Sequence, residues 1–453
     1  MAEAARSVKH YVSDCLPERY PYDPKKGFAG ERLRDAGKVF RGFLPVTVDI
    51  SLESLSNPVV CEEERIKAVH HLYAYSASQE MKVELVQKGV VPLIVSLLNR
   101  EPVLGILEHQ CFMLLRSLCI IPQGCYAVVF GGGLAAALDQ ATKPANPNDE
   151  VPELDPREAA LHVILQIASD FAGVRWLMYP DSHKEFILAD VEYPCATMAY
   201  VENVFRVLAN VLENEPMHTR SGLYALGSLV HMTAFQASAE VCIRGAKCVI
   251  DALSARLGAV AEAVLNEEIL PKEHFLFLER LCEVLWNIAL VEEGLAVLEQ
   301  KHIPDLLFVL FDGCRHDVSP EALALQRTLT GVISAMFKLL DVKLHILQTL
   351  KGGLTHAEAL LAYLDTLNRT IAEADKEDKK VNLYDAGAAV RNTIMALQLA
   401  MEAKQQRDLA RVFLKKLSSE NAEASRQVAE QLFQKTRWGK EFGLPSSVES
   451  FLA

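Results

Sequence analysis

The sequence predicts an all-helical solenoid, a long stack of short helices without a single round core. Half of its 453 residues are apolar and only 7% are aromatic, a composition that favours helices over sheets of β-branched and aromatic residues. One apolar pattern recurs along the chain, and two of its junctions, Gly89 and Gly133, lie 44 residues apart. A period of that length is typical of superhelical arrays of two- or three-helix units.

The first part of the pattern is a helix of the form A-x-x-A-L-x-N-L-A, in which small or apolar residues occupy the A and L positions. Its clearest copies run through 281–289 and 204–211, and weaker copies begin at Cys111, Ala160 and Gly222. Residues three and four apart share one side of a helix, so each copy predicts an amphipathic helix with one buried side.

The second part of the pattern is a junction between two helices. It is clearest at 86–94, where Gly89 precedes Pro92, and at 299–307, where His302 precedes Pro304. Glycine permits the sharp bend after one helix, and proline fits the first turn of the next, where its missing N–H is not needed. Helix starts are predicted separately at Asp155-Pro156 and Ser319-Pro320, which read as a cap followed by proline.

Three segments depart from the pattern and define the domain organisation. Residues 1–45 hold several Pro and Gly residues, which predicts an extended arm. Residues 142–156 hold four prolines, which predicts a long loop inside the array. From residue 401 the apolar spacing continues and then ends, so we expect capping helices and a docking tail in 401–453. The repeat array itself is assigned to residues 46–400.

Hydropathy and cysteine usage bear on the compartment. The chain has no stretch of 18 uncharged apolar residues, and its polar start lacks the apolar core of a signal peptide. The ten cysteines are scattered without metal-type pairs, which indicates free thiols in a reducing compartment. We therefore expect a cytoplasmic protein without a membrane partner.

The net charge of −13 is distributed unevenly. The first 45 residues hold nine Lys or Arg against six Asp or Glu, and residues 401–453 hold nine against seven, which leaves −18 for the middle of the chain. Binding to nucleic-acid phosphates needs concentrated Lys and Arg. Nucleic acid is therefore not expected as a partner, although a basic protein surface could face the acidic body.

Motifs that carry catalysis are missing from the sequence. The glycine run 131–133 lacks the Lys-Ser/Thr of a phosphate loop and lies where a repeat junction belongs. His70, His71 and His162 have no ligand at metal spacing, and neither G-x-S-x-G nor H-E-x-x-H occurs. We expect no catalytic residue, no metal site, no cofactor and no small-molecule substrate, so the protein is not expected to be an enzyme.

The junctions and the helices of Asn210 and Asn287 resemble the armadillo repeat over roughly residues 60–400. The resemblance implies a right-handed superhelix of three-helix units, whose third helices line a groove that binds peptides or partner subunits. The candidate groove residues are those at the Asn position of the pattern or four residues before it: Arg206, Asn210, Tyr224, Glu283 and Asn287.

In the importin-α adaptors of this family, successive third helices carry the pattern W-x-x-x-N. The Trp and Asn side chains of this pattern clamp an extended basic peptide. In this chain the corresponding first positions hold no Trp: they are Met113, His162, Arg206, Tyr224 and Glu283. Trp286 lies next to Asn287 and about 100° around the helix from it, which favours a packing role. A regular Trp/Asn ladder is therefore not expected.

The arm before the first repeat is similar to the armadillo proteins of ciliary radial spokes. The similarity lies in 23–26 (Asp-Pro-Lys-Lys), 28–33 (Phe-Ala-Gly-Glu-Arg-Leu), 64–68 and 85–89, and it covers only the first quarter of the chain. It implies a structural subunit of the axoneme that lies among other spoke or microtubule-associated proteins.

The end of the chain interleaves large aromatics with basic residues. Arg437, Trp438 and Phe442 stand close together within 433–442, and aromatic plus Arg is the composition of interface anchors. These residues are candidates for docking on a neighbouring subunit. Packing back on the last helices of the same chain is the alternative.

The sequence therefore predicts a non-catalytic protein–protein interaction scaffold. We expect a subunit of a large assembly, with the ciliary or flagellar axoneme and its cytoskeleton as the implied location. A soluble adaptor that carries cargo or regulates an enzyme is the alternative. The irregular insertions and the basic, aromatic ends favour the subunit.

Overall fold

The computed structural model describes residues 47–100, 105–143, 155–179, 200–266, 269–337 and 384–399, together with residues 362, 363, 366, 369 and 402. Nearly all of these residues are helical and none of them forms a β-strand, which confirms the predicted all-α solenoid. None of the described helices is both long and apolar enough to cross a membrane. The predicted arm 1–45 and almost all of the tail 401–453, with Arg437, Trp438 and Phe442, lie outside the described residues.

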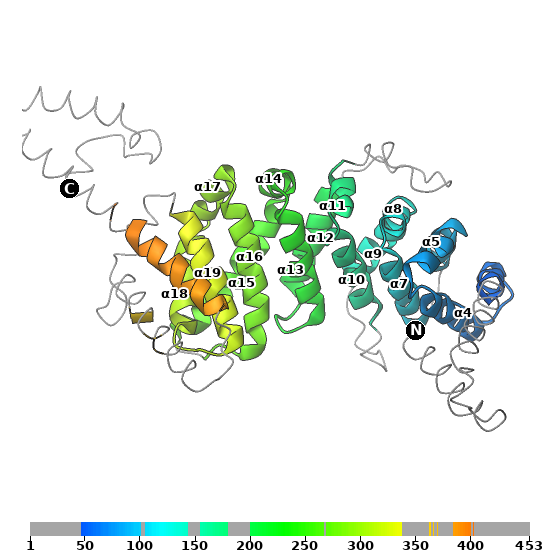
Figure 1. Cartoon of the computed structure of the whole chain (residues 1–453), viewed down its shortest axis with the longest axis horizontal. Coiled ribbons are helices and arrows are strands. Elements are labelled where there is room, and N and C mark those ends of the chain that lie inside the picture. Colours follow the sequence, from blue (N-terminus) through cyan, green and yellow to red (C-terminus); the bar gives the residue numbers. More distant parts are fainter. Residues whose placement is uncertain are drawn as a thin grey trace, which may run out of the picture. The chain divides into compact units, whose positions relative to one another are not determined.

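The chain divides into two compact units, Met1–Ser238 (unit 1) and Ala239–Ala453 (unit 2). In unit 1 the helices form three rows, in which each helix packs on the corresponding helix of the next repeat (Figure 1). The first row is α5 (Gln79–Gln87), α8 (Pro122–Phe130) and α11 (Phe171–Met178). The second row is α6 (Val90–Leu98), α9 (Gly133–Thr142) and α12 (Tyr200–Asn214). The third row is α4 (Glu62–Tyr75), α7 (Gly105–Leu118), α10 (Pro156–Ala168) and α13 (Arg220–Thr233).

Unit 2 repeats the arrangement of rows. Its first-row helix is α17 (Glu292–Gln300), and its second row is α15 (Lys247–Leu265) and α18 (Ile303–Cys314). Its third row is α16 (Phe275–Ala289) and α19 (Pro320–Met336), against which the helix 384–399 also lies. Two further elements are α14 (Gln236–Gly245) and the short 3-10 helix η5 (Lys272–His274).

Three described junctions before second-row helices contain a left-handed residue, whereas Ala246 before α15 does not (φ −116°). Gly89 (φ 75°) precedes α6, and His302 (φ 54°) precedes α18. At the glycine run the left-handed residue is Gly132 (φ 90°) and not Gly133, which is the first residue of α9. The first two left-handed positions are therefore 43 residues apart, because the bend belongs to the residue that caps the helix and not to its first turn.

The predicted helix start at Asp155-Pro156 is confirmed in detail. The Asp155 carboxylate accepts a hydrogen bond from the backbone N–H of Arg157 at 2.8 Å, and Pro156 occupies the first turn of α10. At Ser319-Pro320 the proline again opens the helix, but the Ser319 side chain makes no capping hydrogen bond. Between Thr142 and Pro156, where the long loop is predicted, residues 144–154 lie outside the described part of the chain.

One assignment of the repeat pattern is wrong. The pattern predicts that the copy at 204–211 is equivalent to the copy at 281–289. The structure places 204–211 on α12 in the second row and 281–289 on α16 in the third row. The apolar spacing alone reports that a helix buries one side. It does not report which neighbour covers that side, so it cannot distinguish the rows.

The core of unit 1 includes a buried aromatic cluster between first-row helices. The ring of Trp176 on α11 lies 5.5 Å from that of Tyr126 and 6.3 Å from that of Phe130, both on α8. An ion pair joins the buried Arg157, at the start of α10, to the half-buried Glu215, just after α12. The same guanidinium donates to the carbonyl of Ala141 at 3.0 Å. These contacts tie the third row to the second.

Candidate functional site

The candidate site in unit 1 is one side of the third row. Helices α7, α10 and α13 bury their apolar side, and each also carries residues that are only half-buried. We call this set the third-row strip: Met113, Arg116, His162, Gln166 and Tyr224. Tyr224 is a candidate from the sequence, and Met113 and His162 are its equivalents on the two preceding third-row helices.

At the centre of the strip, His162 stacks on Tyr224. Their ring centroids are 4.4 Å apart and the planes are inclined by 24°. Burial, followed by the positive charge of Arg116, lowers the pKa of His162 to about 4. Burial, followed by the negative charge of Glu158, raises the pKa of Tyr224. Both rings are therefore neutral at physiological pH, and each can offer one polar hydrogen to a ligand.

Arg116 contributes the positive charge of the strip. Its side chain is half-buried, its Nε is buried without a hydrogen-bond partner, and it forms no ion pair within the described part of the chain. Nearby, Arg220 lies 3.5 Å from Glu158. The strip thus presents a partly desolvated guanidinium next to two neutral rings.

At one end of the strip, α7 is joined to α4. The hydroxyls of Ser76 and Ser117 lie 2.7 Å apart, and the Ser117 hydroxyl also donates to the carbonyl of Ser76 at 3.3 Å. Ser117 occupies the Asn position of the pattern, so on α7 this position serves contact between repeats.

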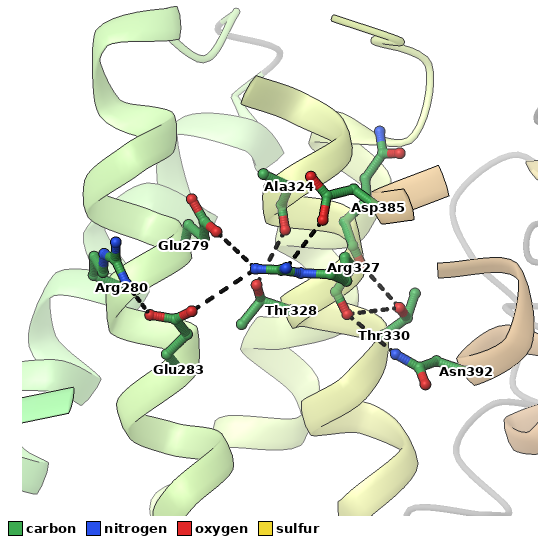
Figure 2. A network of polar contacts seen from close by, with 10 residues as sticks. Glu279, Arg280, Glu283, Ala324, Arg327, Thr328, Thr330, Asp385 and Asn392 are labelled. Carbon is green, nitrogen blue, oxygen red and sulfur yellow. Dashed lines mark hydrogen bonds and ion pairs between the residues drawn. The ribbon is translucent and has the colours of Figure 1, made fainter. Parts of the chain in front are cut away.

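Unit 2 carries a different set of polar residues on its third row. Figure 2 shows the guanidinium of Arg327 on α19 between carboxylates from two other helices. Its nitrogens lie 3.0 Å from Glu279, 3.8 Å from Glu283 and 3.0 Å from Asp385 of helix 384–399. Burial, followed by the charge of Glu283, raises the pKa of Glu279. One arginine therefore holds three carboxylates, and with them three helices.

The structure places the predicted groove residues of unit 2 in and beside this network. Glu283 pairs with Arg280 at 2.7 Å as well as with Arg327. Asn287 is half-buried one turn further along α16. Trp286 packs on α19 so closely that a Cβ at Gly331 would lie 2.5 Å from its ring, which confirms its packing role. Glu283 is therefore committed to contacts inside the chain.

The other predicted groove residues lie in unit 1 but in different rows. Arg206 and Asn210 are exposed on α12, where Asn214 donates to the side chain of Asn210 at 2.7 Å. Tyr224 is on α13 in the third row. The five candidates thus do not belong to one row of one unit, because the pattern grouped second-row and third-row helices together.

Arg116 is not among the residues predicted from the sequence, although the sequence contains a signal for it. It stands one residue before the Asn position of the pattern. The equivalent positions hold Leu165, Gly227 and Trp286, and each of these packs against, or is covered by, a neighbouring helix. A charged residue at a position that is otherwise used for packing marks Arg116 as an exception.

Comparison with known proteins places the fold. No protein-family model and no curated protein matches the chain. A solved structure concerning a conserved phosphorylation switch that controls the interaction between cadherin and beta-catenin aligns at a TM-score of 0.54 and 14% identity, over 95% of this chain and 74% of that chain. A designed armadillo repeat protein in complex with the peptide (KR)4 aligns at a TM-score of 0.42 and 14% identity, over 63% of this chain and 98% of that chain. The first of these likenesses shows that the chain has an armadillo-type solenoid fold.

Proposed function

We propose that the protein is a non-catalytic scaffold that binds other proteins along the third-row strip of unit 1. The observation that carries this proposal is the unpaired, half-buried Arg116 beside the stacked rings of His162 and Tyr224. A stacked aromatic pair with an arginine is the composition of interface anchors. A neutral histidine that stacks on tyrosine is suited to contact and not to proton transfer at neutral pH.

The fold supports the proposal by analogy. The similar beta-catenin structure concerns an interaction with another protein, cadherin. Proteins of one fold can have unrelated functions, so this likeness adds weight to a binding role without naming a partner. The residues of the strip carry the argument about this chain.

The test is affinity capture of partners from native cells with the tagged full-length chain. The double variant His162→Ala and Tyr224→Ala removes the stacked rings and is expected to lose the captured proteins. The matched control is Arg206→Ala with Asn210→Ala, which changes two exposed residues of the second row and is expected to keep them. If partners are still captured by the His162/Tyr224 variant but are lost with the Arg206/Asn210 variant, the binding surface lies on α12 and not on the third-row strip.

The finer proposal is that the scaffold is a structural subunit of the ciliary or flagellar axoneme. It rests on the similarity of 23–26, 28–33, 64–68 and 85–89 to radial-spoke armadillo proteins, and residues 1–46 lie outside the described residues. A tagged chain should remain with axonemes after detergent extraction. Release into the detergent-soluble fraction as a monomer would favour the alternative, a soluble adaptor.

A further inference from the structure

Arg116 differs from Arg157 and Arg327 in having no acidic partner within the described residues. Arg157 is paired with Glu215, and Arg327 is paired with three carboxylates. Arg116 has none within the described residues, and its Nε is shielded from water. A guanidinium that has lost part of its hydration without gaining a partner costs free energy in the isolated protein. An anion that reaches it would recover that free energy.

The groups around Arg116 favour an anion over a cation. The charged groups that face His162 and Tyr224 are Arg116, Arg220 and Glu158, so two positive charges stand against one negative charge. The single acid, Glu158, lies 3.5 Å from Arg220. Arginine offers a planar pair of donors that matches carboxylate and phosphate, while the neutral rings add donors without charge.

The dimensions of the strip indicate an extended ligand. It crosses three successive third-row helices, α7, α10 and α13, which pack side by side. Packed helices lie about 8 to 10 Å apart, so the strip is on the order of 20 Å long. An extended chain covers about 3.3 Å per residue, so roughly six residues of a partner would span it.

We propose that Arg116, His162 and Tyr224 form a binding site for an anionic side chain, a carboxylate or a phosphate ester, of an extended partner segment. The proposal rests on the proposed function and names the chemistry of the partner. The anion occupies the terminal nitrogens of Arg116, and the two rings flank it. The body of the chain is acidic overall, so specificity comes from this local arrangement and not from long-range attraction.

The test uses fluorescein-labelled octapeptides and fluorescence anisotropy with the full-length chain. The probes are (Glu-Ser)4, the same peptide phosphorylated on its serines, and (Lys-Ser)4 as the control of opposite charge. At least one anionic peptide is expected to bind, and (Lys-Ser)4 is not. The stronger of the two anionic peptides identifies carboxylate or phosphate as the preferred group.

Two arginine variants decide whether Arg116 is responsible. Arg116→Gln is expected to weaken binding of the anionic peptide about ten-fold or more, since a charge-assisted pair of hydrogen bonds is lost. Arg206→Gln removes an exposed arginine of α12 and is expected to change binding less than two-fold. Arg116→Lys keeps the charge without the paired donors and is expected to lie between the wild-type chain and Arg116→Gln.

Three results would overturn the proposal. They are equal binding of the anionic and cationic peptides, an equal loss with Arg116→Gln and Arg206→Gln, and an unchanged affinity with Arg116→Gln. Circular dichroism of each variant confirms that it is folded. If native partners bind through the strip but Arg116→Gln does not weaken their binding, the anion site is rejected and the proposed scaffold function remains. Capture that survives loss of His162 and Tyr224 would reject the scaffold surface instead.

Discussion

At the residue scale, two equivalent junctions have the same backbone geometry but different side chains. Gly89 and His302 both adopt a left-handed conformation before a second-row helix. A residue with a Cβ has a steric penalty there that glycine avoids. His302 gains a polar contact in return, since its Nδ1 lies 3.7 Å from a carboxylate oxygen of Asp305. That contact is exposed and so contributes little.

We predict that His302→Gly increases the free energy of unfolding by about 0.5 to 1 kcal/mol, because removing a left-handed penalty of about 1 to 2 kcal/mol outweighs the conformational freedom that glycine adds to the unfolded chain. Gly89→Ala should decrease it by about 1 to 2 kcal/mol. A Cβ at Gly89 meets no atom within 4 Å, so this loss would report backbone strain alone. Urea denaturation measures both. A lower stability of His302→Gly would mean that the contact with Asp305 outweighs the strain.

The paired and unpaired arginines of unit 1 should respond oppositely to substitution. Arg157→Ala leaves the half-buried Glu215 carboxylate with one partner fewer and removes the donor to Ala141, so we predict a loss of up to about 3 kcal/mol. Arg116→Gln removes a charge that has no partner, so we predict unchanged or higher stability. Thermal denaturation monitored by circular dichroism measures the two. Similar losses would show that Arg116 has a structural partner.

At the element scale, helices and their ends could be predicted from the sequence, but their rows could not. Asp155-Pro156, Gly89 and His302 identify helix ends because the backbone there needs those residue types. The helix at 204–211 was assigned to the wrong row, since its spacing fits any helix with one buried side. The same holds for the candidate site: Tyr224 could be predicted because it lies four residues before the Asn position of the repeat pattern. The sequence shows that Arg116 is a charged residue at a position held by Leu165, Gly227 and Trp286 in other repeats, but its lack of a partner is visible only in three dimensions.

The polar network of unit 2 predicts a pH dependence of the contact between α16, α19 and helix 384–399. The raised pKa of Glu279 means that the folded state binds this proton more tightly than the unfolded chain. Stability should therefore fall as pH rises through the window above the ordinary value of 4.5 for glutamate.

Glu279→Gln removes that ionisation and leaves Glu283 and Asp385 as partners of Arg327. We predict that its melting temperature exceeds that of the wild-type chain at pH 7 and that the difference shrinks near pH 4. Melting curves at several pH values test this. A lower melting temperature at pH 7 would mean that attraction to Arg327, at 3.0 Å, outweighs the cost of burial.

At the scale of the whole molecule, the two units present different third-row chemistry. Unit 1 carries an unpaired arginine with neutral rings, whereas unit 2 satisfies its arginine internally with three acids. The acidic sequence of the body therefore does not mean a uniformly acidic binding surface. The likeness to the solved structure concerning cadherin and beta-catenin extends over 95% of the chain at 14% identity and shows the fold alone.

The tail 433–445 is predicted to dock on a neighbouring subunit through Trp438, with Arg437 and Phe442 beside it. Two aromatics four residues apart would share one side of a helix and form an apolar patch. Truncation to residues 1–432 should release the protein from its native assembly, at a cost of at least about 2 kcal/mol if Trp438 is a hot spot. Co-purification and the melting temperature are measured together. Retained assembly with a lowered melting temperature would mean that the tail caps its own array.

The most direct test of the central claim is site-specific photo-crosslinking in native cells. A benzoylphenylalanine in place of Tyr224 would lie on the third row beside His162, and the same residue in place of Asn210 would be exposed on α12. Mass spectrometry of the crosslinked products identifies what each position touches. We predict a partner protein crosslinked from position 224, at an acidic or phosphorylated segment, and none from position 210. A partner crosslinked only from position 210, or from neither position, would contradict binding through the third-row strip.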